Sequence, residues 1–572
     1  MRWIFSYLKP QRKRMSIGFV IKVIGTLAEL FIPMILTYIL EEVIKTQNIS
    51  KIILFGVLMA FCAVVASLGN IIANRMAARV TMIFSSQMRR DLFSKTLMLS
   101  ARSTDAFTVP SLESRITSDT YNVQNFIGMM QRMGVRAPIL LLGGISITLI
   151  MDKFLALIMI ATLPIIFIVV YSISKKGVPL YTKVQRSVDD MVRVVREDAQ
   201  GIRVIKALSK NEYENARYEK VNKKLCREEA YAGTVMGVVN PVMTMLMNLG
   251  IVAVVLASAF LVDKGRSSAA TVIAFMQYFT LISMAMMSLS RMFVMYTKCA
   301  ASANRIASVI EEKSELVKVE DEKKGDESFH ISFENVSFSY LGKKKNLQDF
   351  SVSLKKGQSL GIIGATGSGK STFVRLLLRF YDADSGAIRI NGKDIRSYER
   401  DELTSMFGVA LQNDFLYADT IEENIKFGRD ISNDDMIRAA KIAQAHDFIS
   451  AIPDGYSHNI SAKGTNLSGG QRQRVLISRA IAARPQILIL DDSSSALDYK
   501  TDASLRSALK KELSGTTLIT VAQRVSSVKD CDIIIVIDDG KIIGKGTHEE
   551  LLDACLEYKE ISDSQMGGAF LD

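Results

Sequence analysis

"LGIIGATGSGKSTFVRLLL", Leu360 to Leu378, decides the fold of the second half of the chain, because it reads as an apolar strand, a glycine-rich loop and a helix in that order. Gly364 to Ser371 matches GxxxxGK followed by Ser or Thr without a mismatch. In such a loop, backbone N–H groups surround phosphate oxygens, the helix start adds its positive dipole end, and a lysine adds a point charge. We therefore expect a nucleotide site whose binding residues are Gly364, Thr366, Gly367, Ser368, Gly369, Lys370, Ser371 and Thr372.

A second apolar strand ends in acidic residues that suit the same nucleotide site. "ILILDDSSSALD", Ile487 to Asp498, ends its strand in two consecutive aspartates. Asp491 has the position of a carboxylate that holds Mg²⁺ together with the Ser371 hydroxyl. From Ile331 onward, short Val/Ile-rich strands alternate with glycine turns and helix patterns. This alternation predicts an α/β domain with a largely parallel sheet.

The first half of the chain is apolar enough to lie in a membrane. The protein has 572 residues, 48% of them hydrophobic, and a mean hydropathy of +0.19, which is high for a soluble protein. A helix needs about 20 apolar residues to cross about 30 Å of hydrocarbon. Apolar runs of this length lie near residues 15–41, 52–76, 134–151, 154–174, 232–262 and 268–296. Six crossings would place both termini on one side of the membrane.

Two long charged segments, 77–130 and 175–230, separate these runs, and their helical pattern has few Pro or Gly breakers. Their Lys and Arg residues place them in the cytoplasm by the positive-inside rule, as a helical stalk. The same bias explains the net charge of +12, so we expect no nucleic-acid partner. The five cysteines lie far apart without a CxxC motif or a His pairing, which argues against a disulfide framework and against a zinc site.

Dense charge without apolar periodicity at 311–328 is typical of a linker. The sequence therefore predicts an all-α transmembrane domain of six helices at residues 1–310, a linker at 311–328 and an α/β P-loop ATPase domain at 329–572. The expected location is the cell membrane, in several passes, with the ATPase domain in the cytoplasm.

"NLSGGQRQRVLISRAIAARPQ" lies between the two nucleotide-site strands and contains LSGGQ at Leu467, Ser468, Gly469, Gly470 and Gln471. This signature, at a short distance before the Asp-ended strand, distinguishes ABC transporters from other P-loop ATPases. The whole chain resembles an ABC exporter half-transporter, and most closely the degenerate-site subunit of bacterial heterodimeric multidrug exporters. The six apolar spans and the missing coiled coil exclude a soluble DNA-repair ATPase with the same signature.

The resemblance implies further roles, residue by residue. Tyr340 would stack on adenine, the alternative being an ordinary tyrosine of an edge strand. Gln412 would reach the Mg²⁺ ion with Ser371 and Asp491, and Asp498 would cross a dimer interface. The signature would bind ATP held by the opposing subunit, because Ser468, Gly469 and Gly470 open a helix whose N–H groups face a γ-phosphate.

Two catalytic positions depart from the family pattern. The family has glutamate where this chain has Asp492, and histidine where it has Gln523. Losing one methylene withdraws the carboxylate by about 1.5 Å, which costs on the order of 100-fold in rate, and glutamine carries no titratable proton. We expect a site that binds Mg-ATP well and hydrolyses it slowly, paired with a half-transporter that has an intact glutamate and histidine. The alternative is ordinary turnover through small backbone shifts.

Methionines are dense in the last two spans and suit a cavity that accepts varied apolar shapes, although each one alone is better explained by packing or by contact with lipid. They are Met236, Met243, Met245, Met247, Met276, Met284, Met286, Met287, Met292 and Met295. Glu29 is an acid inside a span. It would attract cationic drugs or pair with a neighbouring helix through Arg132, Arg136 or Arg291.

The expected function is therefore ATP-driven export of amphipathic small molecules. The alternatives are a lipid or peptide exporter and an ATP-binding regulatory or sensor subunit that does not pump.

Overall fold

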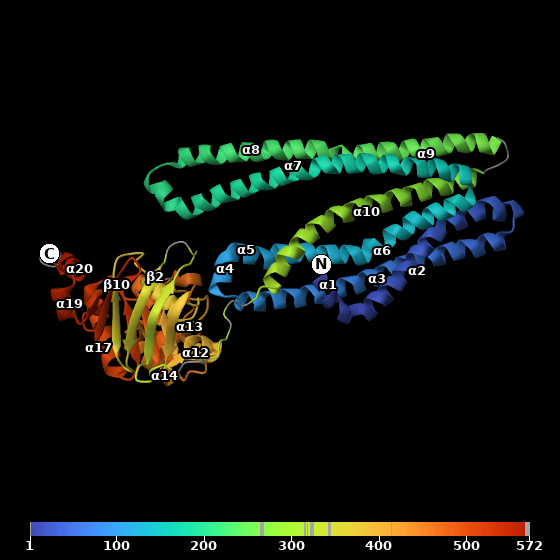
Figure 1. Cartoon of the computed structure of the whole chain (residues 1–572). Coiled ribbons are helices and arrows are strands. Elements are labelled where there is room, and N and C mark those ends of the chain that lie inside the picture. Colours follow the sequence, from blue (N-terminus) through green and yellow to red (C-terminus); the bar gives the residue numbers. More distant parts are fainter. Residues whose placement is uncertain are drawn as a thin grey trace. The chain divides into compact units, whose positions relative to one another are not determined.

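The computed structural model describes residues 2–263, 268–313, 316, 318–320, 325–340, 342, 345–412 and 414–566 (Figure 1). It divides into two compact units. The helical unit contains residues 1–98 and 107–312, and the α/β unit contains residues 99–106 and 313–572. Parts of the expected linker and of the loop before residue 268 lie outside the described residues.

The helical unit consists mainly of long helices, with the short helices α1 and α5 beside them. They are α1 (Arg2–Leu8), α2 (Arg12–Tyr38), α3 (Ile49–Leu97), α5 (Val109–Ser114), α6 (Thr120–Met151), α7 (Lys153–Ala207), α8 (Asn211–Gly237), α9 (Val239–Asp263) and α10 (Ala269–Ile310). Local caps explain where several begin: the Asp152 carboxylate accepts the Phe154 and Leu155 N–H groups at the start of α7, and the Ser268 hydroxyl accepts the Thr271 N–H at the start of α10. The helix α4 (Ala101–Phe107) spans the boundary between the two units.

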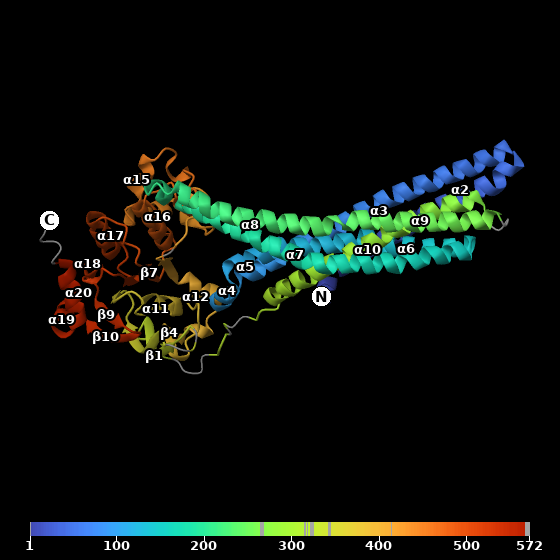
Figure 2. The ribbon, with the colours of Figure 1, turned by 90° about the horizontal axis from the view of Figure 1, so that it is seen from above.

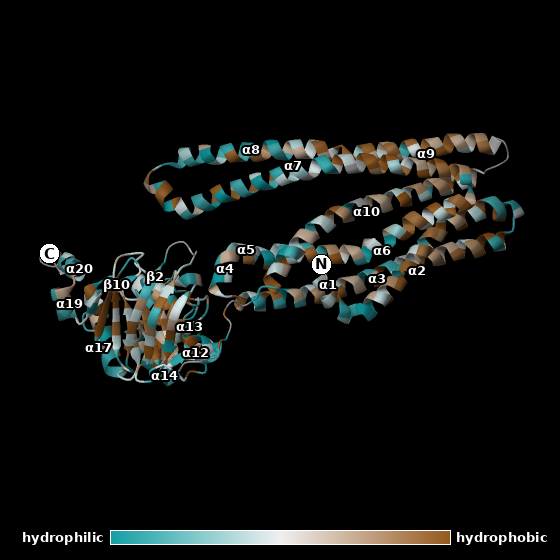
Figure 3. Ribbon diagram, in the orientation of Figure 1, coloured by the Kyte–Doolittle hydropathy of each residue, from teal (hydrophilic) through white to brown (hydrophobic). Residues whose placement is uncertain are grey.

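Within the described residues, five helical segments are long and apolar enough to cross a membrane: Trp3–Thr46, Ile49–Leu97, Val109–Met151, Asn211–Leu261 and Ala269–Ile310. The run predicted at 154–174 is the first part of α7, where Lys153–Val169 forms a shorter apolar segment. Figure 3 shows the apolar residues concentrated along one part of each long helix, with polar residues over the rest. The charged halves of α3 and α7 continue the same helices without interruption, as the sequence predicts.

Two helix groups are visible in the helical unit, since α8 and α9 run along α7 in both Figure 1 and Figure 2, while α2, α3, α6 and α10 pack on one another. The buried Tyr278 of α10 donates its hydroxyl to the Leu30 carbonyl of α2 over 2.7 Å. A Cβ atom added at Gly143 would lie 2.6 Å from the Leu30 side chain, so glycine permits the close approach of α6 to α2.

The α/β unit contains two sheets within the described residues. The first has strand order β2-β1-β4-β5 and is antiparallel: β1 (Ile331–Phe338), β2 (Leu347–Leu354), β4 (Ser385–Ile390) and β5 (Lys393–Asp394). The second has order β10-β9-β3-β8-β7-β6: β3 (Ser359–Ile363), β6 (Phe407–Ala410), β7 (Ile487–Asp491), β8 (Thr517–Val521), β9 (Ile533–Asp538) and β10 (Lys541–Gly546). All its pairs are parallel except β10 with β9, which confirms the predicted α/β fold.

The order β3-β8-β7-β6 positions the site, because parallel neighbours end at the same edge of a sheet. The glycine loop follows β3, and Gln523 follows β8 by two residues. Asp491 ends β7, and Gln412 follows β6 by two residues. Four separate stretches of sequence are thereby brought to one edge.

Candidate nucleotide site and signature helix

The loop between β3 and the helix α11 (Lys370–Leu377) has a backbone that only glycine tolerates. Gly364 has φ +154°, and a Cβ atom there would lie 2.1 Å from the Ile537 carbonyl oxygen. Gly369 has φ +115°, and its Cβ atom would lie 2.8 Å from the Asn346 carbonyl oxygen. The predicted glycines therefore serve a tight turn that leaves the start of α11 accessible.

Polar groups in this loop fit a phosphate ligand. The Lys370 ammonium donates to the Gly364 and Ala365 carbonyl oxygens, both over 2.8 Å. Burial lowers the pKa of Lys370, although the nearby Asp491 and Asp492 carboxylates act in the opposite direction. The buried Ser368 hydroxyl has no hydrogen-bond partner among the described residues. A buried hydroxyl without a partner is costly, and a phosphate oxygen would satisfy it.

Asp491 and Ser371 form the adjacent metal-binding pair. Asp491 is buried at the end of β7, and the nearby Ser371 side chain acts to lower the pKa of its carboxyl. Burial raises the pKa of Asp491, the charge of Asp492 raises it further, and the charge of Lys370 opposes both. A hydroxyl and a carboxylate that lie near one another fit two protein ligands of a Mg²⁺ ion whose other ligands are phosphates and water.

Asp492 is the centre of a small hydrogen-bonded group that the sequence does not reveal. Its Oδ2 atom accepts the Gln412 Nε2–H group over 3.1 Å and the Gln523 Nε2–H group over 3.2 Å. All three side chains singled out as catalytic are therefore in contact. We call Asp492, Gln412 and Gln523 the carboxylate–amide group.

The backbone and the charge of Asp492 are both unusual. Asp492 has φ +48°, in the left-handed region, and its N–H group donates to the Val521 carbonyl oxygen of β8 over 2.8 Å. Burial raises the pKa of Asp492, while the bond from Gln412 and the charge of Lys370 lower it. The carboxylate is thus a fixed acceptor with one oxygen already bonded twice.

Tyr340 lies beside the loop in an aromatic group with Phe338 and Tyr381. Its ring meets both edge-on, with centroid distances of 4.9 and 5.1 Å. The Tyr340 hydroxyl accepts a bond from the Arg375 guanidinium over 3.2 Å and lies 3.4 Å from the Thr372 hydroxyl. Tyr340 is half-buried and its ring is held in place by α11, which fits a base-stacking role as well as a packing role.

Tyr381 connects this aromatic group to the segment 99–106. Its hydroxyl donates to the Asp105 carboxylate over 2.5 Å. Sequence reasoning missed both residues, because their positions are 276 residues apart and neither belongs to a motif. The only available signal was the position of Asp105 inside the first cytoplasmic excursion.

The signature motif forms the start of the helix α16 (Gly469–Ala482). The Ser468 hydroxyl accepts the Gln471 N–H group, and the Gln471 side chain accepts the Ser468 N–H group over 2.9 Å. This reciprocal capping box holds the helix start in a defined geometry. A Cβ atom at Gly470 would lie 3.1 Å from the Ala496 carbonyl oxygen, so glycine also allows this close approach.

The signature helix and the glycine loop belong to different parts of the α/β unit. Phe373 and Leu376 of α11 pack in the core around β1 and β3, whereas Val475 and Ile477 of α16 pack in a second core. Figure 2 shows the two helices apart within the unit. This separation is as expected if the signature serves a nucleotide bound elsewhere.

Gln473 connects the signature helix to the segment that contains Asp498. Its side chain accepts the Ala496 N–H group over 3.0 Å and donates to the Ser495 hydroxyl over 3.3 Å. Asp498 caps the helix α17 (Tyr499–Glu512) by accepting the Thr501 N–H group, which lowers the pKa of Asp498. Asp498 is exposed, so it remains accessible to a partner.

A further residue missed by sequence reasoning is Gln565 of the C-terminal helix α20 (Leu556–Met566). Its side chain donates to the Gln523 carbonyl oxygen over 2.8 Å and accepts the Val525 N–H group over 2.8 Å. The amide thus fixes the backbone that directly follows the Gln523 side chain. No local pattern around position 565 indicates this role.

In the helical unit, the intramembrane acid has a definite partner. The Glu29 carboxylate accepts two bonds from the Arg136 guanidinium, over 2.6 and 3.1 Å. Of the two hypotheses for Glu29, the structure therefore favours the helix pair, and of the three arginines it selects Arg136. The acid is neutralised within the unit rather than presented alone.

Comparisons with known proteins agree with this architecture. A family model described as the ABC transporter transmembrane region matches residues 15–286, and one described as ABC transporter matches residues 347–495. The chain is 33% identical to the uncharacterised ABC transporter ATP-binding protein YfiB of Bacillus subtilis, over 99% of both chains. It is 30% identical to the uncharacterised ABC transporter ATP-binding protein YfiC of the same organism, over 99% of this chain and 94% of that one.

A solved structure, described as a bacterial Atm1-family ABC exporter with ATP bound, has the same fold. Its TM-score is 0.83 at 24% identity, and the match covers 97% of this chain and 98% of the other. The likeness extends through both units.

Proposed function

The chain belongs to the ABC transporter family, and we propose that it is one half of a heterodimeric exporter that uses ATP to carry amphipathic small molecules out across the bacterial plasma membrane. In this proposal its own glycine loop holds an ATP molecule that is split slowly. Its signature helix completes a second ATP site on a partner half-transporter, where most of the hydrolysis takes place.

The observation that carries the proposal is the carboxylate–amide group. A general base must reach the attacking water, but Asp492 is one methylene shorter than glutamate, and one of its oxygens already accepts both glutamine amides. Raising its basicity would require breaking these bonds. Gln523 cannot take up or release a proton, so it does not replace a histidine.

Groups that bind nucleotide are retained in the same unit. The glycine loop, Lys370 and the buried Ser368 hydroxyl supply donors for phosphate oxygens. When Mg²⁺ is bound, Ser371 and Asp491 would hold it and it would neutralise phosphate charge, with Gln412 within reach of the same edge. Binding without efficient hydrolysis is the expected result, because the altered residues are those that act on water.

The intact signature is the reason for proposing a different partner. Its capping box, both glycines and the Gln473 bonds to the segment before Asp498 are all in place. In a homodimer both sites would combine an intact signature with a weak base. A partner with glutamate and histidine would instead give one efficient site, in which Ser468 of this chain meets the γ-phosphate.

The test is to purify the tagged chain from its native membranes, identify the co-purifying half-transporter and measure uptake of fluorescent amphipaths into inside-out vesicles. We expect one partner with glutamate and histidine at the equivalent positions, and uptake that needs ATP and is blocked by vanadate. Recovery of the chain alone, with rapid ATP hydrolysis, contradicts the heterodimer.

The second candidate is a regulatory subunit that binds ATP without pumping. The Asp492 carboxylate favours it as well, because an oxygen that already accepts two amide hydrogen bonds is poorly suited to activate water. Such a subunit would bind ATP and leave vesicle uptake unchanged. Uptake driven by the complex in the experiment above excludes it.

A further inference from the structure

The chain passes between the two units at three points, which follow residues 98, 106 and 312. Near the second and third of these points, five polar side chains of the helical unit contact one another. They are Arg115 and Asp119, from the stretch between α5 and α6, and Ser302, Arg305 and Ser308, from the last turns of α10. We call these five residues the clamp.

Asp119 is the buried centre of the clamp, with 2% of its side chain exposed. Its carboxylate accepts the Arg305 Nε–H group over 2.7 Å, a second N–H group of the same guanidinium, and the Ser302 hydroxyl over 2.8 Å. A bond with two prongs between a guanidinium and a carboxylate fixes direction as well as distance. Because a carboxylate buried this far depends on its partner, the start of α6 and the end of α10 are held together here.

Arg115 connects the end of α10 to the residue at which the chain re-enters the helical unit. Its guanidinium donates to the Arg305 carbonyl oxygen over 2.8 Å and to the Ser308 hydroxyl over 2.7 Å. The same guanidinium lies over the Phe107 ring, 4.6 Å from the ring centroid. Phe107 is the last residue of α4 and the first residue after the second crossing point. One side chain therefore contacts the chain next to two of the three crossing points.

The backbone between Phe107 and α6 departs from a regular helix at two places. Thr108 has φ +63° and ψ +142°, a region that residues other than glycine rarely adopt. Residues Arg115–Asp119 form one wide π-type turn, and such turns occur frequently at functional sites. The first and last residues of this turn both belong to the clamp. Conformations of this kind persist where neighbouring contacts hold them, and the clamp supplies such contacts.

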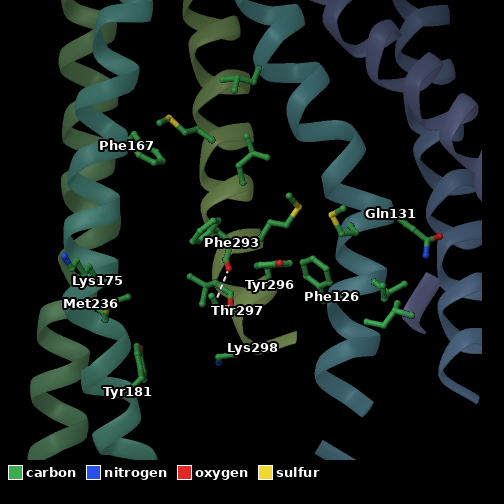
Figure 4. A pocket seen from close by; sticks show the side chains of 18 of the residues that line it. Phe126, Gln131, Phe167, Lys175, Tyr181, Met236, Phe293, Tyr296, Thr297 and Lys298 are labelled. Carbon is green, nitrogen blue, oxygen red and sulfur yellow. Dashed lines mark hydrogen bonds between the residues drawn. The ribbon is translucent and has the colours of Figure 1, made fainter. Parts of the chain in front are cut away.

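The two helices that the clamp joins, α6 and α10, form one wall of a large cavity in the helical unit (Figure 4). The cavity has a volume of about 1980 Å³, and α7 with α8 forms the opposite wall. Figure 4 shows Phe126 of α6 beside Tyr296 of α10, and their ring centroids are 5.7 Å apart. Three of the methionines expected at a cavity also line it: Met236, Met286 and Met292. Because the clamp and the ring pair both join α6 to α10, this wall can move as one body.

The segment before the second crossing point belongs to the α/β unit. Asp105 in this segment accepts the Tyr381 hydroxyl over 2.5 Å, and the Tyr381 ring contacts Tyr340, the residue expected to stack on adenine. Only Ala106 separates Asp105 from Phe107. A short continuous stretch of chain thus links the nucleotide side to the clamp.

We propose that Arg115, Asp119 and Arg305 are positioning residues for transport. They keep the start of α6 and the end of α10 together, so that a displacement of the segment 99–106 during the ATP cycle moves the α6–α10 wall of the cavity as one body. This inference rests on the proposed export function and specifies how ATP use is coupled to it. Without the clamp, ATP is still hydrolysed, but the uptake per ATP falls.

The experiment uses the purified complex of this chain and its partner in lipid vesicles, and measures ATP hydrolysis and uptake of a fluorescent amphipath in the same preparation. Arg305→Gln leaves the buried Asp119 carboxylate without its partner, so uptake per ATP should fall about 30-fold, and Arg115→Ala should lower it about threefold. Arg305→Lys keeps the charge and should recover part of the loss. The control is Glu113→Gln, at an exposed residue of α5 outside the clamp, and it should behave as wild type.

A clamp that serves stability alone would lower hydrolysis and uptake in the same proportion. A ratio of uptake to hydrolysis that stays at the wild-type value in Arg305→Gln and Arg115→Ala therefore overturns the proposal. If the wild-type vesicles take up no amphipath in the presence of ATP, the export function itself fails, and the inference fails with it.

A cross-link gives an independent test that leaves Asp119 and both arginines in place. Asn122 of α6 donates to the Ser302 hydroxyl over 3.1 Å, so cysteines at these two positions lie within reach of a short, reducible thiol cross-linker. The five native cysteines are first changed to alanine. The linked complex should transport at close to the rate of the unlinked complex, because the two helix ends stay together throughout the cycle. Loss of uptake on cross-linking, with recovery on reduction, would show that they separate and overturns the proposal.

Discussion

Two regions of the α/β unit, the start of the signature helix α16 and the end of β7, differ in how closely their residues follow the pattern expected of an ATP-hydrolysing site. At the start of α16, Ser468 and Gln471 form a complete capping box and the glycines make the close approaches that the helix start needs. At the end of β7, Asp492 lies in a left-handed conformation with its carboxylate bonded to two glutamines. In the proposed heterodimer, the residues that would bind the partner's nucleotide keep the family pattern, whereas the residues that would activate water at the chain's own site do not.

The largest effect is expected from Ser468→Arg. Arginine removes the cap of α16 and places a bulky cation where a γ-phosphate is expected, so turnover by the partner's site should fall at least about 100-fold. Steady-state ATPase of the purified complex measures it. Ser457→Arg, at an exposed residue shortly before the signature, is the matched control. Equal activity of the two variants would break the comparison, because the signature would then serve no active site.

The next largest effect should come from restoring the family residues. Asp492→Glu with Gln523→His lengthens the base and supplies a titratable ring, so hydrolysis at this chain's own site should rise about 10- to 100-fold. It is best measured with the partner's catalytic glutamate changed to glutamine, which leaves this site as the source of product. Asp491 is untouched, so Mg²⁺ binding serves as the control. An unchanged rate would mean that these two residues do not limit the site.

The sequence predicts the glycine loop, Asp491 and the signature because each is a short pattern with a local physical reason. It also places Gln412 and Gln523 at one sheet edge once the strands are parallel neighbours. It does not predict that both amides bond to Asp492, since that depends on side-chain directions at the ends of three strands. For Glu29 the sequence offers three arginines, and helix packing selects Arg136.

Contacts between distant segments are the part that sequence reasoning misses. Gln565 bonds to the backbone of Gln523 and Val525, and Asp105 bonds to Tyr381 across 276 positions of the sequence. Neither residue stands in a motif, and polar residues on exposed helices usually face water. Only the packing of α20 and of the segment 99–106 on the α/β unit gives these side chains a partner.

A smaller effect is expected from Gln565→Ala. Loss of the two hydrogen bonds to the backbone that follows the Gln523 side chain should loosen the carboxylate–amide group and speed release of ATP from this site about threefold. Dissociation of a fluorescent ATP analogue measures it, with Lys559→Ala on the same helix as the control. If both variants release nucleotide at the wild-type rate, α20 does not position Gln523.

The smallest effect concerns stability and pH. Burial raises the pKa of Asp492, so the folded state binds more protons than the unfolded state between the two pKa values. The charge of Asp492 therefore costs stability, a cost that is absent at acid pH and grows as the pH rises through the unfolded and then the folded pKa. Asp492→Asn keeps an acceptor oxygen for both glutamines and should raise the unfolding temperature at neutral pH. Melting curves across pH measure the difference, which should vanish toward acid; a difference of the opposite sign would mean that the two amide bonds outweigh burial.

The most direct test of the central claim is to count nucleotides in the purified complex after a chase. The complex is loaded with Mg-ATP, allowed a few turnovers, and quenched, and the bound ATP and ADP are separated. We predict about one intact ATP retained per complex, lost when Lys370 is changed to alanine in this chain and retained in Ser468→Arg. Complexes that retain no intact ATP, with both bound nucleotides converted to ADP at equal rates, would contradict it.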